Sequence, residues 1–123
     1  MTLVYVAVGG ALGSSARFLL AGAINRHGAF YAPAGTFVVN VLGCFLFGVI
    51  VALADRRLPL AASTRAFLLV GVLGGFTTFS SYTFETFVLM RQAQLWRAAL
   101  NAGGQVVAGL VALWAGVASV RGW

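Results

Sequence analysis

The chain has 123 residues, of which 61% are hydrophobic and only 8% are charged, whereas a soluble globular domain carries roughly 25% charged residues. The mean hydropathy of +0.97 is too high for a surface in contact with water. The formal net charge is +6, but the basic residues lie singly between long apolar runs, whereas a nucleic-acid site gathers them on one face. The composition argues against a soluble enzyme, a disordered tail and a nucleic-acid binder, and indicates an integral membrane protein.

Four stretches are long and apolar enough to cross a bilayer as helices, which takes about 20 residues each. In chain order they cover residues 3–23, 36–54, 66–90 and 98–120. The polar connections between them are short, so there is no room for a soluble catalytic or ligand-binding domain. The sequence therefore predicts a single four-helix transmembrane domain over residues 1–123, of the all-α class and without enzymatic activity.

The basic residues give almost no orientation signal. With four spans, both termini and the middle connection share one side of the membrane. Four arginines fall on that side and three on the other: Arg56, Arg57, Arg65 and Arg121 against Arg26, Arg91 and Arg97. Because orientation follows the Lys/Arg bias of short loops, this near balance predicts insertion in both orientations and an antiparallel pair of copies. A single topology set by one dominant loop is the alternative.

Small residues recur at four-residue spacing in three of the spans, at Gly9 and Gly13, at Gly71 and Gly75, and from Gly104 to Gly116. Such spacing lets helix backbones approach closely, which is a main source of helix association in lipid. Four helices of this length form too small a bundle to enclose an ion pathway comfortably. We therefore expect a dimer.

Polar residues inside the spans are the candidate functional residues, because polar groups in a membrane mark pathways more often than not. Thr36 and Asn40 share one face of the second span, and Asn101 and Gln105 share one face of the fourth. The densest cluster, at residues 74–83 (GGFTTFSSYT), predicts a helix broken at mid-membrane, which supplies carbonyls to a cation and amide groups to an anion. The alternative is that Ser and Thr bond to their own helix and only bend it.

Residue types that are missing narrow the function further. The spans contain no paired carboxylates, no histidine cluster and no HExxH motif, which argues against a metalloenzyme or an intramembrane acid–base enzyme. A small dual-topology multidrug exporter has a similar size, but its chemistry needs a carboxylate in the first span, where this chain has only Arg17. A purely structural membrane protein would leave the polar cluster of the third span unexplained. The positive intramembrane charge favours an anion.

Three motifs resemble those of the Fluc fluoride channels, which are CrcB-type proteins: GGALGSSAR at residues 9–17, GTFVVNVLGCFLFG at 35–48 and GVLGGFTTFSSYTFET at 71–86. The resemblance covers essentially the whole chain. It implies a passive fluoride-selective channel in the bacterial plasma (inner) membrane, which exports fluoride and relieves fluoride toxicity. It also implies two antiparallel subunits in the lipid bilayer, with two pores at their interface.

The resemblance also assigns roles to single residues. Asn40 matches the pore asparagine, and Phe79 matches the first of two pore phenylalanines, whose positive ring edge can accept fluoride. The backbone carbonyls of Gly74 and Thr77 match positions that bind a structural sodium ion at the subunit interface. Ser81 is the first choice among the hydroxyls beside the break. Arg17 and Glu85 are expected near a pore mouth, and whether they pair with each other stays open.

The chain departs from the family pattern in two places. Tyr82 stands where the second pore phenylalanine is expected, and its hydroxyl is expected to bond Asn101 or Gln105. The hydroxyl stripe of the last span is replaced by Asn101 and Gln105, followed by Gly109 and Leu113. With Thr36, these residues complete the expected fluoride path. The departures raise the alternative that this chain is one subunit of a heterodimeric fluoride channel.

Overall fold

The computed structural model describes residues 1–27, 34–56 and 59–122, and the elements within these ranges are all helices. Three spans are single helices: α1 (Thr2–His27), α2 (Ala34–Arg56) and α6 (Leu95–Arg121). The third consists of α3 (Ala62–Arg65), the π-helix η1 (Ala66–Leu73), α4 (Gly74–Phe76) and α5 (Phe79–Arg91). Four helical stretches of the described residues are long and apolar enough to cross a membrane, which confirms the predicted all-α chain with four candidate spans.

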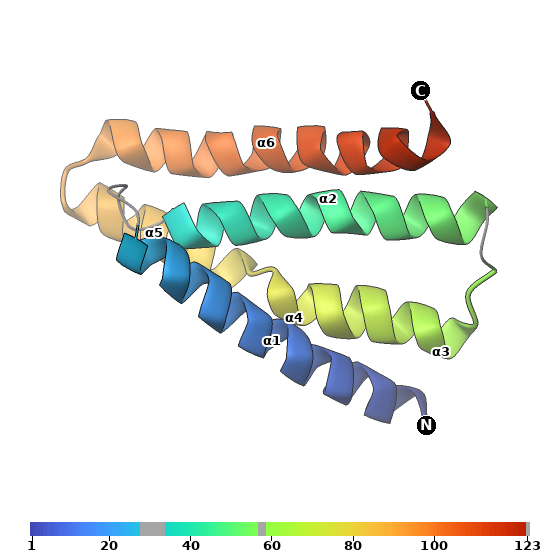
Figure 1. The fold of residues 1–123 in the computed structure, drawn as a ribbon. Helices are drawn as coiled ribbons and strands as arrows, with labels where there is room; N and C mark the ends of the chain where they lie inside the picture. The colour runs from blue at the N-terminus through green and yellow to red at the C-terminus, as the bar shows by residue number, and fades with distance from the viewer. Residues whose placement is uncertain (28–33, 57–58, 123) are drawn as a thin grey trace.

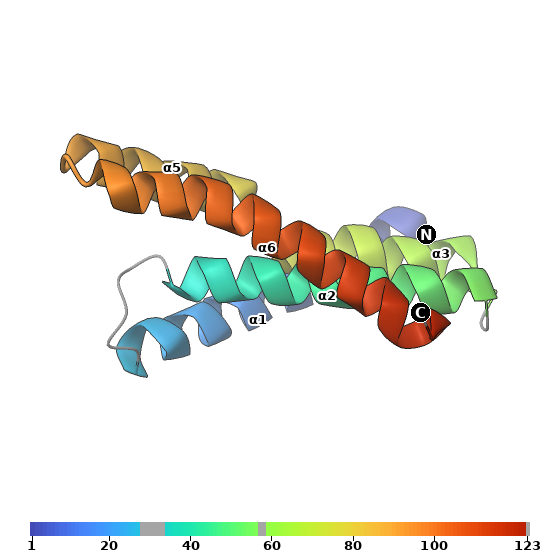
Figure 2. The same cartoon turned by 90° about the horizontal axis from the view of Figure 1, so that it is seen from above.

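Helix α2 lies in the middle of the molecule, with α6 along one side and α1 and the third span along the other (Figure 1). The beginnings of α1 and α3 and the ends of α2 and α6 lie at one end of the molecule (Figure 1). This is the alternation on which the arginine count depends; Arg57, which that count includes, lies outside the described residues. Figure 2 shows that α6 crosses over α2, with the first part of α6 beside α5.

Glycines bring the helix backbones into contact. A β-carbon at Gly9 of α1 would lie 2.6 Å from the carbonyl oxygen of Phe67 in η1. A β-carbon at Gly116 of α6 would overlap the carbonyl of Phe45 in α2. Both pairs therefore pack closely only because no side chain stands between them, as the small-residue spacing predicts. Most large hydrophobic side chains point outward instead of into a core, which suits a hydrocarbon environment.

The third span is interrupted for two residues. Thr77 and Thr78 have an extended backbone, with φ/ψ of −83°/157° and −149°/114°, so the helix is interrupted within this span; that the break lies at mid-membrane stays a prediction. The break is shorter than the polar cluster of residues 74–83, because Thr78 caps α5 at once: its hydroxyl accepts a hydrogen bond from the Ser81 N–H. The π-helix η1, which only the three residues of α4 separate from the break, is a second irregularity that the sequence motifs did not predict.

Candidate functional site

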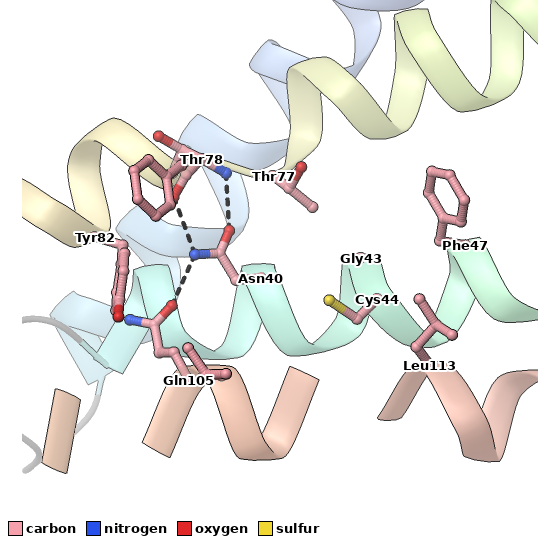
Figure 3. Close-up of a pocket in the computed structure, with 11 residues that line it drawn as sticks. Asn40, Gly43, Cys44, Phe47, Thr77, Thr78, Tyr82, Gln105 and Leu113 are labelled. Carbon is pink, nitrogen blue, oxygen red and sulfur yellow. Dashed lines mark hydrogen bonds between the residues drawn. The ribbon is translucent and has the colours of Figure 1, made fainter. Parts of the chain in front are cut away.

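The contact between Asn40 on α2 and Thr78 at the break forms the centre of the site (Figure 3). The Thr78 backbone N–H donates to Asn40 Oδ1 (2.8 Å), and Asn40 Nδ2 donates to the Thr78 carbonyl (3.1 Å). One side chain thereby satisfies both backbone groups of a residue that lies outside any helix. Since unpaired backbone groups cost several kcal/mol in an apolar environment, Asn40 is what makes the break tolerable there.

Asn40 also connects the break to α6. Its Nδ2 donates a second hydrogen bond to Gln105 Oε1 (2.8 Å), and Gln105 Nε2 donates to Asn101 Oδ1 (3.0 Å). Asn101 Nδ2 donates in turn to the Thr86 hydroxyl on α5 (2.9 Å). Asn101 and Gln105 are only 6% and 8% exposed. The prediction that these two amides share one face of the helix is therefore confirmed, and that face is buried against α2 and α5.

The carbonyls of Gly74 and Thr77 are among those that lose their helical donors at the break. In a continuous α-helix, the carbonyl of Gly74 would accept from the N–H of residue 78, and that of Thr77 from the N–H of residue 81. Here the Thr78 N–H donates to Asn40, and the Ser81 N–H donates to the Thr78 hydroxyl (3.2 Å). These are the two carbonyls that the resemblance assigns to sodium.

Phe79 and Tyr82 lie together on α5 just after the break, with ring centroids 5.6 Å apart and ring planes inclined by 47°. The Tyr82 hydroxyl donates to the carbonyl of Ala102 on α6 (2.7 Å). The expected partners, Asn101 and Gln105, were therefore wrong, although the partner does lie on the expected helix. The physical reason is the alignment of α5 with α6, which brings the Tyr82 hydroxyl to the Ala102 carbonyl.

A cavity of about 370 Å³ opens between α2, α6, the break and the start of α5 (Figure 3). Asn40, Thr78 and Gln105 give it a polar end, and Phe47 and Leu113 line its apolar end. Phe79 and Tyr82 border it as well. The structure thus brings four of the predicted pore side chains to one cavity, and Asn101 joins them through Gln105.

A second cavity, of about 460 Å³, holds the remaining predicted residues, Thr36, Ser81, Arg17 and Glu85. Arg17 Nε donates to the Gly75 carbonyl (3.1 Å), and the Thr36 hydroxyl donates to Glu85 Oε1 (2.7 Å). Glu85 Oε2 is buried without a hydrogen-bond partner in the described part of the chain. Arg17 and Glu85 therefore share a cavity, but each uses another partner, and no ion pair joins them among the described residues.

Sequence reasoning did not single out three residues that make contacts in the site: Thr78, Thr86 and Ala102. Thr78 lines both cavities and so lies between them. A hydroxyl residue directly before a helix is an N-cap signal, which could have singled it out. Thr86 and Ala102 carry no local signal, because their contacts depend on how α5 and α6 align.

Comparison with known proteins identifies relatives of this chain. The family model described as CrcB-like protein, Camphor Resistance (CrcB), matches residues 4–117. A protein of Nitratidesulfovibrio vulgaris named fluoride-specific ion channel FluC is 45% identical over 97% of this chain and 96% of its own length. A protein of the same name from Geobacter sulfurreducens is 42% identical over 98% of this chain and 97% of its own length. Another, from Opitutus terrae, is 46% identical over 91% of this chain and 86% of its own length. With a match of this extent, the chain belongs to the CrcB-like protein family.

Proposed function

We propose that this chain is a subunit of a passive fluoride-selective channel that exports fluoride and so relieves fluoride toxicity. The observation that carries the proposal is the near-complete match to proteins named fluoride-specific ion channels, at 42–46% identity. The structure adds that the motifs behind this match meet in space, since Asn40 of the second motif contacts Thr78 of the third. A cationic drug suits the site less well, because the charged residue of the first span is Arg17.

The path that we propose runs through both cavities, with Thr78 between them. Arg17 lines the cavity of about 460 Å³ and concentrates anions there, and the Ser81 hydroxyl in the same cavity is a neutral group that attracts fluoride weakly. Beyond Thr78, in the cavity of about 370 Å³, fluoride meets two more such groups, the Gln105 amide and the edge of the Phe79 ring. Weak attraction suits conduction, because an ion that binds too tightly at one site does not leave it.

A structural sodium ion at the subunit interface is part of the proposal. The carbonyls of Gly74 and Thr77 fit a hard cation, because such ions prefer oxygen ligands and these two carbonyls have lost their helical donors to Asn40 and Thr78. Bound sodium would supply positive charge that stabilises this end of α4. In a crystal structure we expect sodium density coordinated only by these carbonyls from both subunits; a water molecule there would contradict this part of the proposal.

We further propose that two copies pair antiparallel in a bacterial plasma membrane and form two pores at their interface. Phe79 is 79% exposed although it borders the cavity of about 370 Å³, so a second subunit is needed to enclose the ion there. The near balance of arginines on the two sides supports opposite orientations of the two copies. A related second chain in place of a second copy is the alternative.

Fluoride efflux from liposomes that contain only this protein tests the proposal. With potassium fluoride inside and a potassium ionophore present, we expect rapid fluoride release, and no chloride release when chloride replaces fluoride. Efflux no faster than from protein-free liposomes would contradict a homodimeric channel. Activity that returns only when a related second chain is added would indicate the heterodimer.

A further inference from the structure

Four side chains at the site form one continuous series of hydrogen bonds that begins and ends on backbone groups of the third span. It runs from the Thr78 N–H to Asn40, then to Gln105 and Asn101 on α6, and then to Thr86 on α5. The Thr86 hydroxyl finally donates to the Tyr82 carbonyl (2.9 Å). The two amides of α6 thus connect the break itself to a point two turns further along α5.

The two ends of this series fix its direction. The backbone group of Thr78 that faces Asn40 Oδ1 is an N–H, which can only donate, and the group of Tyr82 that faces Thr86 is a carbonyl, which can only accept. Each amide between them must therefore accept with its oxygen on the Thr78 side and donate with its nitrogen on the Thr86 side. Rotating the amide of Asn40 or Gln105 by 180° would bring like groups together at every one of its contacts, and rotating that of Asn101 would do so at Gln105.

Asn40 has no donor to spare in this arrangement. Its Nδ2 carries two hydrogens, one donated to the Thr78 carbonyl and the other to Gln105. In this series of hydrogen bonds, Gln105 is the one residue outside the break that contacts Asn40, and at 8% exposure its contact with Asn40 is largely shielded from water. The orientation of Asn40, and through it the backbone at Thr78, therefore depends on an acceptor at position 105.

We infer that Gln105 is a positioning residue, which fixes the conformation of the break through Asn40 and is itself oriented by Asn101 and Thr86. The consequence for fluoride transport rests on the proposed function, whereas the consequence for the break does not. A shorter hydroxyl side chain at position 105 keeps a polar group on this face, but it does not reach from Asn40 to Asn101.

Hydrogen exchange of the Thr78 backbone amide, measured by NMR on the full chain in lipid nanodiscs, tests this role directly, since that N–H is protected by Asn40. Gln105→Met keeps the length of the side chain and removes its polar groups, and Gln105→Thr keeps only a hydroxyl. In both variants we expect Thr78 to exchange roughly tenfold faster or more, and fluoride efflux to fall roughly tenfold or more.

Two more variants separate positioning from pore lining. Gln105→Glu keeps the length and the acceptor for Asn40, so we expect Thr78 protection within about threefold of the parent while the carboxylate stops fluoride. Thr86→Val removes the acceptor of Asn101 at the far end, and we expect Thr78 to exchange about two- to fivefold faster. Thr83→Val is the matched control, because within the described part of the chain the Thr83 hydroxyl donates only to the Phe79 carbonyl of its own helix; it should leave Thr78 exchange unchanged.

Thr78 exchange at the parent rate in both Gln105→Met and Gln105→Thr would overturn the inference. Parent-like fluoride efflux in Gln105→Thr would overturn it as well, because Gln105 would then supply only polarity. If the parent chain carries no fluoride, the proposed function fails, and the exchange rates still decide the role of Gln105. Amides elsewhere in α2 and α6 report whether each variant keeps its fold.

Discussion

A β-carbon at Gly43 would overlap the methyl group of Thr77, so the bare backbone of α2 is seated directly against the first residue of the break. Gly43 and Asn40 lie three positions apart on α2 and face the break together. One helix face therefore both makes room for the interruption of the third span and satisfies its backbone groups.

Gly43→Ala should consequently displace the break. Overpacking of a closely packed site costs about 1–3 kcal/mol, and here the added methyl group pushes Thr77 away from α2. We expect a lower thermal unfolding temperature in detergent and a clear loss of fluoride efflux. Gly103→Ala is the matched control, because a β-carbon there meets no atom within 4 Å. Equal behaviour of the two variants would show that the fit between Gly43 and Thr77 has no role.

Asn40→Asp should block fluoride passage. The carboxylate keeps the acceptor for the Thr78 N–H, but it loses both donated hydrogen bonds and places a negative charge beside the proposed anion path. We expect fluoride efflux to fall roughly tenfold or more, as measured with a fluoride electrode on liposomes. If the variant folds and assembles like the parent and also conducts at the parent rate, Asn40 does not line the pore.

Phe79→Ile should lower fluoride efflux without unfolding the chain. The ring is 79% exposed, so its loss removes little packing within one chain, but it also removes the positive ring edge from the cavity. Phe84→Ile provides the control, since Phe84 lies on the same helix, is 65% exposed and is not among the residues that line that cavity. An efflux that falls equally in both variants would point to a general effect of aromatic residues on assembly.

The four spans could be predicted because uninterrupted apolar runs of this length have few other structures available. Asn40, Asn101 and Gln105 could be found in the same way, because an amide in an apolar helix is conspicuous and a four-residue spacing fixes its face. The sequence could not show the partner of Tyr82 or the part played by Thr86. These contacts depend on how α5 and α6 align, and that alignment results from many weak side-chain contacts acting together.

The details of the third span were also beyond local patterns. Its glycines and hydroxyl residues indicate a break, but they do not place it at Thr77 and Thr78. That position follows from which backbone groups find partners: Asn40 from α2 for Thr78, and Arg17 from α1 for the carbonyl of Gly75. Both partners are distant in sequence, so only the packed structure shows where the helix can stop.

The proposed antiparallel pair predicts that either terminus is accessible from both sides of the membrane. Single cysteines at the N-terminus or the C-terminus of a Cys44→Ala variant should react with a membrane-impermeant thiol reagent in intact cells and in inverted vesicles alike. The near balance of arginines is the reason, because neither side holds the chain in one orientation. Labelling from one side alone would indicate a fixed topology and a partner other than a second copy.

Tyr82→Phe examines the clearest departure from the family pattern. The hydroxyl of Tyr82 donates to the Ala102 carbonyl at 2.7 Å, which connects α5 to α6 at the edge of the cavity that its ring lines. Removing it leaves that carbonyl without this donor and costs about 1 kcal/mol of stability, while the ring stays in the lining of the cavity.

We therefore expect Tyr82→Phe to keep the preference for fluoride over chloride and to change fluoride efflux by roughly two- to fivefold, since α5 is held less firmly beside the path. Tyr5→Phe is the matched control, because Tyr5 is a partly exposed residue near the start of α1 and is not among the residues that line either cavity. Efflux unchanged in both variants would mean that the Tyr82 hydroxyl is merely tolerated where the family has phenylalanine. A loss of selectivity would instead assign the hydroxyl itself to the ion path, because only a group in contact with the ion can distinguish fluoride from chloride.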